Sequence, residues 1–236
     1  VPQENHWLIC KAFAVITPNN HVLKDVSRHY PGQLPGCSGT ESTHDIFLQK
    51  TLPPIEKVNG TVAVLTGLSG NVYFHWLVDI LPRLGLLKQS GIDLKSIDGF
   101  WINQVTQPFQ RETLKILGVP LEKIISSDDH PHIEAQELIV PSFSSYLGWL
   151  SPWGLKFLRD QFLTPLLQEK TTSPERIYIC RSSARHRRVL NEEVVIDYLK
   201  TRGFVPVSLE TLSFQEQINY FAKAKVIIAP HGSGLT

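Results

Sequence analysis

The sequence predicts an α/β protein built on parallel sheets, and three observations lead to this fold class. Short apolar runs, typical of buried strands, alternate along the chain with longer amphipathic segments, typical of helices. From Pro174 onward the order is strand, helix, strand, helix, strand, which favours parallel strands with helices on the faces of the sheet. The chain has 236 residues, of which 42% are hydrophobic and 19% charged, so it can form two small domains and is not intrinsically disordered.

The first sixty residues are the least regular part of the chain and carry no motif that indicates a function. We expect strands within His6–Thr17 and within His44–Gln49, separated by Pro- and Gly-rich turns around Pro31–Gly36. Further along, residues 62–65 form a short apolar run that predicts a buried strand. The remaining elements expected before the C-terminal part are strands at 99–102, 124–125 and 138–140, and helices at 72–88, 109–117 and 151–168.

A polar stretch at Thr171–Pro174 is the best candidate for a linker. We expect an N-terminal domain over 1–150, a helix and linker over 151–173, and a C-terminal domain over 174–236. The elements expected in the last of these are strands at 176–180, 204–209 and 226–229, a helix capped by Asn191, and a helix opened by the capping box of Ser213 and Glu216. The chain contains no methionine and stops directly after a glycine turn, so we expect further sequence beyond Thr236 and a C-terminal domain that is truncated here.

Composition excludes several classes of protein. The net charge is only +1, so no global charge draws the chain to nucleic acid or to a membrane surface. The apolar runs are far too short to span a bilayer, and no signal peptide is recognisable. The three cysteines are distant from one another and fit neither a disulfide framework nor a zinc site. These features favour the cytoplasm and leave room for peripheral association with a membrane assembly.

The helix expected over 72–88 carries the first candidate for chemistry. His75, Asp79 and Arg83 are spaced four residues apart and therefore share one stripe of this helix. The helix follows a strand and a glycine turn, which puts His75 near the carboxyl ends of the strands, where ligands bind in open parallel sheets. Either His75 or Asp79 can accept a proton from a hydroxyl, histidine more readily at neutral pH. The alternative is structural: His75 packs or caps, and Asp79 pairs with Arg83 on the surface. Pro82 predicts a kink or an early end of the helix.

A loop rich in arginine follows the strand at 176–180. Its four arginines are Arg181, Arg185, Arg187 and Arg188. Arginine binds phosphate through a planar fork, so a loop at this edge of a sheet favours a diphosphate site. The alternative is a solvated basic loop. A nucleic-acid interface is not indicated, because four of the nine Lys and Arg residues from Pro174 onward lie in this one loop instead of along a basic face.

A glycine turn follows the last expected strand and contains His231, Gly232, Ser233 and Gly234. Glycine allows close approach of the backbone, and a helix starting here would point its N–H groups at an anion. An ordinary turn is the alternative.

Two further signals are weaker. The polar stretch Asp128–His132 fits no standard metal site, so we expect a polar loop. An aromatic cluster that includes Trp149 and Trp153 can stack on sugars or pack between domains.

Four blocks, taken together and in this order, resemble glycosyltransferase family 61. They are the segments Tyr73–Leu84, Tyr178–Glu192, Leu209–Gln217 and His231–Thr236. Relatives in this family include plant arabinoxylan transferases, animal O-linked N-acetylglucosaminyltransferases of the secretory pathway and bacterial polysaccharide enzymes, and the resemblance favours a bacterial member. It runs from about Gly60 to the last residue.

The resemblance implies a GT-B architecture, with two Rossmann-like domains facing across a cleft, and an inverting transfer from a nucleotide sugar. It implies that Arg181 and the arginines at 185–188 hold the diphosphate, that the turn at 231–234 closes this pocket, and that Glu210 meets the ribose or the base. His75 and Asp79 then face the acceptor. The residues expected beside them on the acceptor side are Arg83, Trp149 and Trp153.

The expected ligands follow from this reading. The donor is a nucleotide sugar, and the acceptor is a hydroxyl of a glycan or a similar molecule, in polysaccharide biosynthesis. We expect no metal and no other cofactor, because the sequence contains no Asp-x-Asp motif and arginines can neutralise the leaving diphosphate. Two alternatives stay open: a non-catalytic module of GT-B fold that binds a sugar or a nucleotide, and a nucleotide-sugar epimerase.

Overall fold

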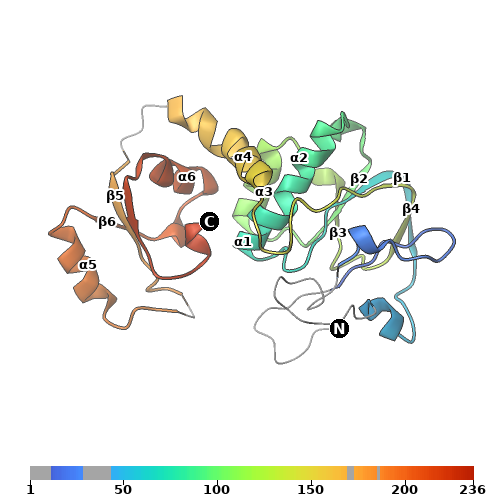
Figure 1. Ribbon diagram of the computed structural model, residues 1–236, viewed down its shortest axis with the longest axis horizontal. Helices are drawn as coiled ribbons and strands as arrows, with labels where there is room; N and C mark the ends of the chain where they lie inside the picture. The colour runs from blue at the N-terminus through green and yellow to red at the C-terminus, as the bar shows by residue number, and fades with distance from the viewer. Residues whose placement is uncertain (1–11, 29–43, 169–172, 185–186) are drawn as a thin grey trace. The chain divides into compact units, whose positions relative to one another are not determined.

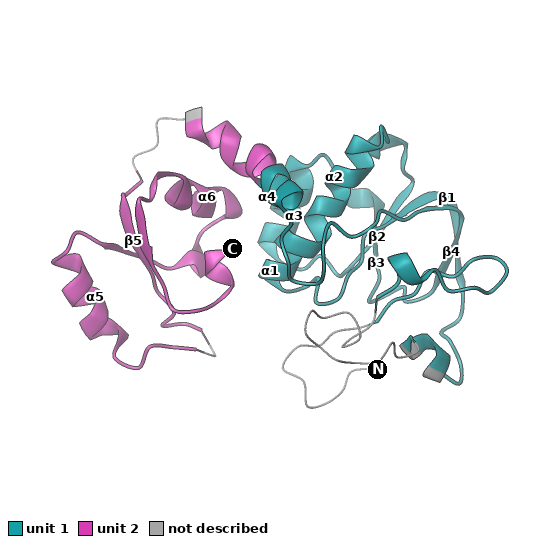
Figure 2. Ribbon diagram, viewed as in Figure 1, with its two compact units in different colours: residues 1–158 teal, residues 159–236 magenta. Residues whose placement is uncertain are grey.

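The computed structural model describes residues 12–28, 44–168, 173–184 and 187–236. It divides the chain into two units, residues 1–158 and 159–236, each with its own parallel sheet (Figure 2). The boundary between the units falls inside the helical segment that the sequence predicts over 151–168. Among the described helices, none combines the length and the apolar character that crossing a membrane requires.

The sheet of unit 1 has four strands in the order β3-β2-β1-β4, and all three pairings are parallel (Figure 1). The strands are β1 (Glu56–Val64), β2 (Gly99–Ile102), β3 (Ile124–Ser126) and β4 (Ile133–Ile139). The predicted strands are therefore confirmed, although β1 and β4 begin several residues earlier than expected. The extension of β1 is mostly polar, is more exposed than the rest of the strand and contains a bulge near Gly60, whose φ of +85° favours glycine.

The helix predicted over 72–88 is continuous but changes its winding. It consists of α1 (Tyr73–His75), a π-helical turn (Trp76–Ile80) and α2 (Leu81–Gln89). Pro82 neither ends the helix nor stands at its end. In the wide turn the amide of Leu81 bonds back five residues to the carbonyl of Trp76. This wider winding directly before Pro82 accommodates a residue that has no N–H and whose ring crowds the preceding turn.

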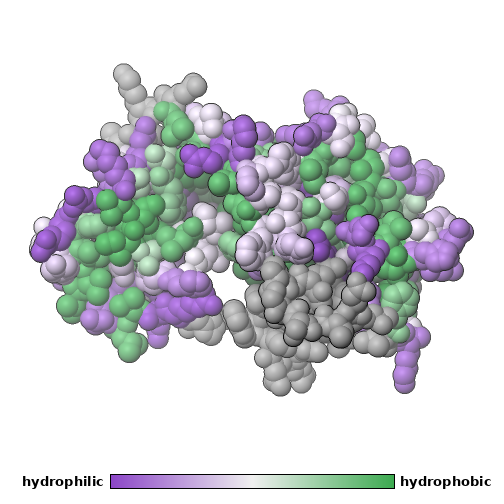
Figure 3. Space-filling model, viewed as in Figure 1, coloured by the Kyte–Doolittle hydropathy of each residue, from purple (hydrophilic) through white to green (hydrophobic). Residues whose placement is uncertain are grey.

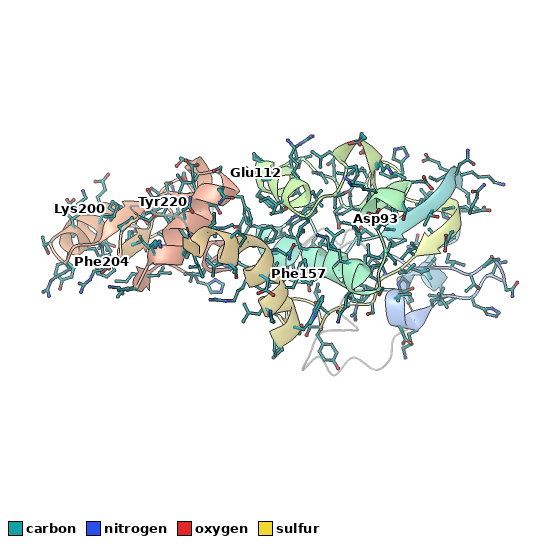
Figure 4. All side chains as sticks on the ribbon, turned by 90° about the horizontal axis from the view of Figure 1, so that it is seen from above. Asp93, Glu112, Phe157, Lys200, Phe204 and Tyr220 are labelled. Carbon is teal, nitrogen blue, oxygen red and sulfur yellow. The ribbon has the colours of Figure 1, made fainter. Side chains whose placement is uncertain are left out.

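Two further helices belong to unit 1. They are α3 (Pro108–Ile116) and α4 (Pro152–Leu158). Phe157 of α4 (labelled in Figure 4) and Trp153 lie against Gly85 of α2. A Cβ atom at Gly85 would come within 2.7 Å of the Phe157 ring. Glycine at this position therefore allows the two helices to pack closely, although glycine inside a helix is less stable than alanine.

The N-terminal segment differs from its prediction. Residues 12–28 form two isolated antiparallel bridges, Phe13 to Arg28 and Ile16 to Val22, and residues 6–11 of the expected strand lie outside the described range. The strand expected over His44–Gln49 is wrong, because Asp45–Leu48 is a 3-10 turn. The His44 ring explains this turn: Nδ1 accepts the amide proton of Ile46, and Nε2 lies 3.1 Å from the carbonyl of Phe13.

The sheet of unit 2 has three parallel strands in the order β6-β5-β7 (Figure 1). The strands are β5 (Arg176–Ile179), β6 (Val205–Val207) and β7 (Val226–Ile228), and the helices are α5 (Glu192–Lys200) and α6 (Phe214–Lys223). The predicted order of strand, helix, strand, helix, strand is confirmed. The helical segment Arg159–Gln168 packs on α6, where the rings of Phe162 and Phe214 meet edge to face at 5.1 Å.

Alternate residues of β5 bury two core clusters on opposite faces of this sheet. Ile177 and Ile179 pack with residues of α6, whereas Tyr178 and Cys180 pack with residues of α5. Burial on both faces is what a central strand of a parallel sheet requires. Apolar and polar residues alternate on the surface of this end of the molecule (Figure 3), and among the apolar ones Leu190 is 99% exposed and Val194 of α5 is 67% exposed.

The two predicted helix caps of unit 2 have different outcomes. The capping box is confirmed, since Ser213 and Glu216 each bond the backbone amide of the other. Asn191 occupies the N-cap position of α5, but its side chain makes no capping bond. The next residue, Glu192, instead turns its carboxylate into the protein interior.

Candidate active site

The carboxyl edge of the sheet in unit 2 carries the residues predicted to bind the donor. Because β5, β6 and β7 are parallel, their carboxyl ends lie at one edge. Arg181 follows β5, Glu210 follows β6, and His231 follows β7. The topology therefore gathers three segments that are far apart in the sequence, as expected for a ligand site in an open α/β sheet.

Arg181 and Gly232 are in direct contact at this edge. A Cβ atom at position 232 would collide with Nη1 of Arg181 and would lie 3.0 Å from its Cζ. Gly232 has a φ of 165°, which is extended backbone, so glycine is needed for space and not for conformation. The sequence predicted a close approach of the backbone to an anion, and the structure puts a guanidinium against that backbone.

Arg187 joins the same cluster. Its Nη1 donates a hydrogen bond of 2.9 Å to Nδ1 of His231, across 44 residues of sequence. Arg187 has a φ of 58°, a conformation uncommon outside glycine and asparagine. The Arg187 side chain is exposed, and a guanidinium at such a position suits an anion such as phosphate.

The other predicted donor residues have mixed outcomes. Arg188 is exposed, and Arg185 lies outside the described residues. Glu210 is also exposed, and it accepts a hydrogen bond from Ser208. Ser233 starts a 3-10 turn, while Gly234 packs against Leu209 of the core, where a Cβ atom would come within 2.9 Å of Cδ1. Gly234 therefore has a packing role.

Glu192 is a residue whose bonds the sequence did not reveal. It is 5% exposed, and its Oε1 accepts bonds from the Tyr178 hydroxyl at 3.0 Å and from the backbone N–H of Arg181 at 2.8 Å. Burial and the bond to Glu192 raise the pKa of Tyr178 to about 12, so the phenol keeps its proton. This arrangement fixes the point at which the chain leaves β5 and enters the arginine loop. The only signal in the sequence is an acidic residue in the first turn of a helix, a position that is favourable against the helix dipole.

The histidine and carboxylate predicted in unit 1 form a direct pair. His75 Nδ1 lies 2.7 Å from Asp79 Oδ2, and the two side chains are 13% and 8% exposed. The carboxylate also accepts the backbone N–H of Gly148 at 3.0 Å. A carboxylate only accepts, so Nδ1 is the donor in this bond; in a neutral imidazole Nε2 is then the acceptor. Asp79 is buried and His75 is partly exposed, so the pair has the geometry of a general base held by a carboxylate.

Arg83 does not have the position that an acceptor-binding residue needs. Its side chain has no exposed surface, and its guanidinium donates to the backbone carbonyls of Val64, Thr66 and Pro141 at 2.8–3.0 Å. Burial lowers the pKa of Arg83 to about 9, which leaves it charged at neutral pH. Arg83 thus ties the helix to the end of β1 from inside the core. The spacing of four residues correctly predicts that Arg83 shares a helix face with His75 and Asp79, but it does not indicate how deeply the Arg83 side chain is buried.

The loop after β4 supplies the surroundings of Asp79. Gly148 has a φ of +72°, and a Cβ atom there would come within 3.5 Å of the His75 ring. The neighbouring Trp149 is 59% exposed, which is consistent with its predicted place on the acceptor side. Trp153 is half-buried and stacks on Phe157 at 5.9 Å between ring centroids, so it has a packing role.

Arg28 is a second residue that the sequence did not indicate. Its Cζ lies 3.8 Å from the centroid of the Phe143 ring, and Arg83 Cζ lies 4.6 Å from the same centroid. Burial lowers the pKa of Arg28, while the negative charge of Asp79 acts in the opposite direction. A lone arginine in an irregular segment gives no pattern by which it could have been found.

The polar stretch Asp128–His132 uses its side chains within the protein. Asp128 accepts the amide proton of Gln104, and His130 pairs with Glu56 at 2.7 Å. Within the described ranges there is no group of three or more His, Cys, Asp or Glu side chains arranged to hold a metal ion.

Taken together, the fold and these clusters define a class of protein: a transferase built from Rossmann-like α/β units, with an arginine site in one unit and a histidine–carboxylate pair in the other. A family comparison makes this more specific, because the model of Glycosyltransferase 61 matches residues 73–236, well over half of the chain. The chain belongs to glycosyltransferase family 61. Glycosyl transfer implies a nucleotide-sugar donor and a glycan acceptor. None of the curated proteins matches the chain.

Proposed function

We propose that this protein is an inverting glycosyltransferase of polysaccharide biosynthesis, which moves a sugar from a nucleotide-sugar donor to a hydroxyl of a glycan. The observation that carries the proposal is the meeting of Arg181, Arg187 and His231 at the carboxyl edge of the sheet in unit 2. Guanidinium groups bind phosphate oxygens through charge-assisted hydrogen bonds, and a diphosphate is the charged part common to these donors.

The acceptor side of the reaction is assigned to His75 and Asp79. As the acceptor hydroxyl attacks the anomeric carbon, its proton passes to Nε2 of His75, and Asp79 stabilises the imidazolium that forms. The bond between the anomeric carbon and the diphosphate oxygen breaks, and its electron pair leaves with the diphosphate. Attack from the face opposite the leaving group inverts the anomeric configuration.

The departing diphosphate needs positive charge. Arg181 and Arg187 would supply it, so that no metal ion is required. We further propose the GT-B architecture, with two Rossmann-like domains, for the whole enzyme.

The first test is binding of nucleotides by calorimetry, with UDP, GDP and their common sugars as probes. Arg181→Ala should abolish binding and keep the fold. The matched control is Arg202→Ala: Arg202 precedes β6, at the amino edge of the sheet, and should have no effect. Equal affinity of Arg181→Ala and wild type for every bound probe would overturn the assignment of the donor site. Transfer is then tested with the donor that binds, by following release of the nucleoside diphosphate in the presence of glycan acceptors.

A further inference from the structure

The loop after β4 carries two exposed aromatic side chains, Tyr146 and Trp149. They are 61% and 59% exposed, although tryptophan is highly buried on average. The amide of Trp149 donates a hydrogen bond of 3.0 Å to the carbonyl of Tyr146, so the two residues are the first and the last of one tight turn. The Cα atoms of two such residues lie within about 7 Å of each other. One short segment therefore presents both rings to solvent.

This turn lies directly against the histidine–carboxylate pair. Gly148, its third residue, donates its N–H to both oxygens of the Asp79 carboxylate, at 3.0 and 3.2 Å. A Cβ atom at Gly148 would stand 3.5 Å from Cε1 of His75, and Cε1 is the ring atom bonded to Nε2. Since consecutive Cα atoms are about 3.8 Å apart, the Cα atom of Trp149 is at most about 9 Å from Cε1 of His75. The exposed rings thus start close to the nitrogen that would receive a proton.

The loop is held at both ends, which gives the turn a defined place in the unit. At its start, the carbonyl of Pro141 accepts a hydrogen bond of 3.0 Å from the buried guanidinium of Arg83. At its end, the hydroxyl of Ser151 accepts the amide proton of Gly154 at 3.0 Å and so caps α4. A turn that is fixed before a ligand arrives lowers the entropic cost of binding.

Other aromatic residues of the same region pack against the protein. Phe143 lies against the core cluster that contains Val62 and Val64, and Trp153 stacks on Phe157. Exposure is therefore a particular property of the two rings in the turn and not of the whole aromatic cluster.

Exposed aromatic rings beside a base suit a sugar as ligand. The C–H groups on one face of a pyranose are apolar and slightly positive, and the face of an aromatic ring carries the negative part of its quadrupole. The Tyr146 hydroxyl and the Trp149 indole N–H are polar groups that can bond sugar hydroxyls at the rim. Leu150, the next residue, is also exposed, so this surface favours a neutral sugar.

We propose that Tyr146 and Trp149 form an aromatic platform for the acceptor, a neutral glycan whose pyranose rings stack on it by a C–H face. Stacking on the platform holds the attacking hydroxyl of the glycan at Nε2 of His75. The role of this glycan as acceptor rests on the proposed function. Binding of the sugar does not, because stacking needs neither a nucleotide nor turnover.

The test measures sugar binding in the absence of nucleotides. The probes are neutral oligosaccharides of glucose, xylose, galactose or mannose in the pyranose form, and NMR titration with saturation transfer reports their binding. The variants are Trp149→Ala, Trp149→Phe and Tyr146→Ala. The matched control is Tyr198→Ala, because Tyr198 is an aromatic residue of α5 in the other unit and is also 59% exposed.

Wild type should bind at least one probe, and C–H protons of the bound sugar should shift upfield because they lie over an aromatic ring. The Kd should rise by about 5- to 20-fold in Trp149→Ala and by about 2- to 10-fold in Tyr146→Ala. Trp149→Phe should retain most of the affinity, and Tyr198→Ala should retain all of it. In a transfer assay, Trp149→Ala should raise the acceptor KM far more than it lowers kcat.

The proposal is overturned if no probe binds to wild type, if Trp149→Ala binds as tightly as wild type, or if Tyr198→Ala loses as much affinity. Self-association of wild type that Trp149→Ala abolishes, with sugar binding unchanged, would also refute it, since the surface would then contact a second copy of the chain. Failure of the proposed function gives a different result. Nucleotides would then not bind at the arginine cluster, while sugars would still bind and Trp149→Ala would still weaken their binding.

Discussion

The substitution Gly232→Ala should weaken donor binding while leaving the stability of the fold nearly unchanged. The new methyl group would occupy the space of Nη1 of Arg181 and would stand 3.0 Å from its Cζ. The backbone at Gly232 is extended, so alanine introduces no conformational strain there. The end of a long side chain is what has to move, and this movement costs little folding free energy.

The magnitude follows from the interaction that is displaced. A hydrogen bond between a guanidinium and a phosphate contributes about 1.5–3 kcal/mol, because one partner is charged. Since about 1.4 kcal/mol corresponds to a factor of ten, the affinity for a nucleoside diphosphate should fall by about 10- to 100-fold. The free energy of unfolding should change by less than about 1 kcal/mol, because no core contact is lost.

Gly234→Ala is the matched control in the same turn. Its Cβ atom would press on Leu209 of the core, at 2.9 Å from Cδ1, so it should lower the stability by about 1–3 kcal/mol. Calorimetry with UDP and GDP gives the affinities, and urea denaturation gives the stabilities. The reasoning is refuted if Gly232→Ala binds as tightly as wild type, or if it loses stability to the same extent as Gly234→Ala.

Three further predictions concern catalysis, packing and metal. His75→Ala should lower kcat by about 10²–10⁴ with donor affinity retained, whereas His130→Ala should leave kcat unchanged; near-normal turnover in His75→Ala would return this histidine to a structural role. Gly85→Ala should destabilise the protein by about 1–2 kcal/mol in thermal or urea unfolding although it raises helix propensity, because its methyl group meets Phe157; a more stable variant would contradict the close packing of α2 and α4. Transfer activity should survive EDTA, and loss of turnover restored by manganese would direct attention back to Asp128–His132.

The sequence by itself determined the features that depend on near neighbours. Apolar runs and amphipathic periods predict the parallel strands and most of the helices, because burial of one face selects residues at fixed spacing. The spacing of four residues between His75 and Asp79 predicts their contact for the same reason, since a helix brings such positions together. The capping box at Ser213 is equally local. The arginine density and the parallel order of the strands together predict a basic cluster at the carboxyl edge of the sheet.

Only the tertiary structure decided the contacts between distant segments and the depth of each side chain. The bond from Gly148 to Asp79 spans 69 residues, and the bond from Arg187 to His231 spans 44. Periodicity says which face of a helix a residue occupies, but not what covers that face. For this reason Arg83 was expected at the acceptor and is found in the core, and Arg28, in a segment without any pattern, is found against the ring of Phe143. The burial of these side chains depends on how the loop after β4 and the N-terminal segment pack within the unit. Such packing involves residues that are far apart in the sequence, so no short stretch of sequence predicts it.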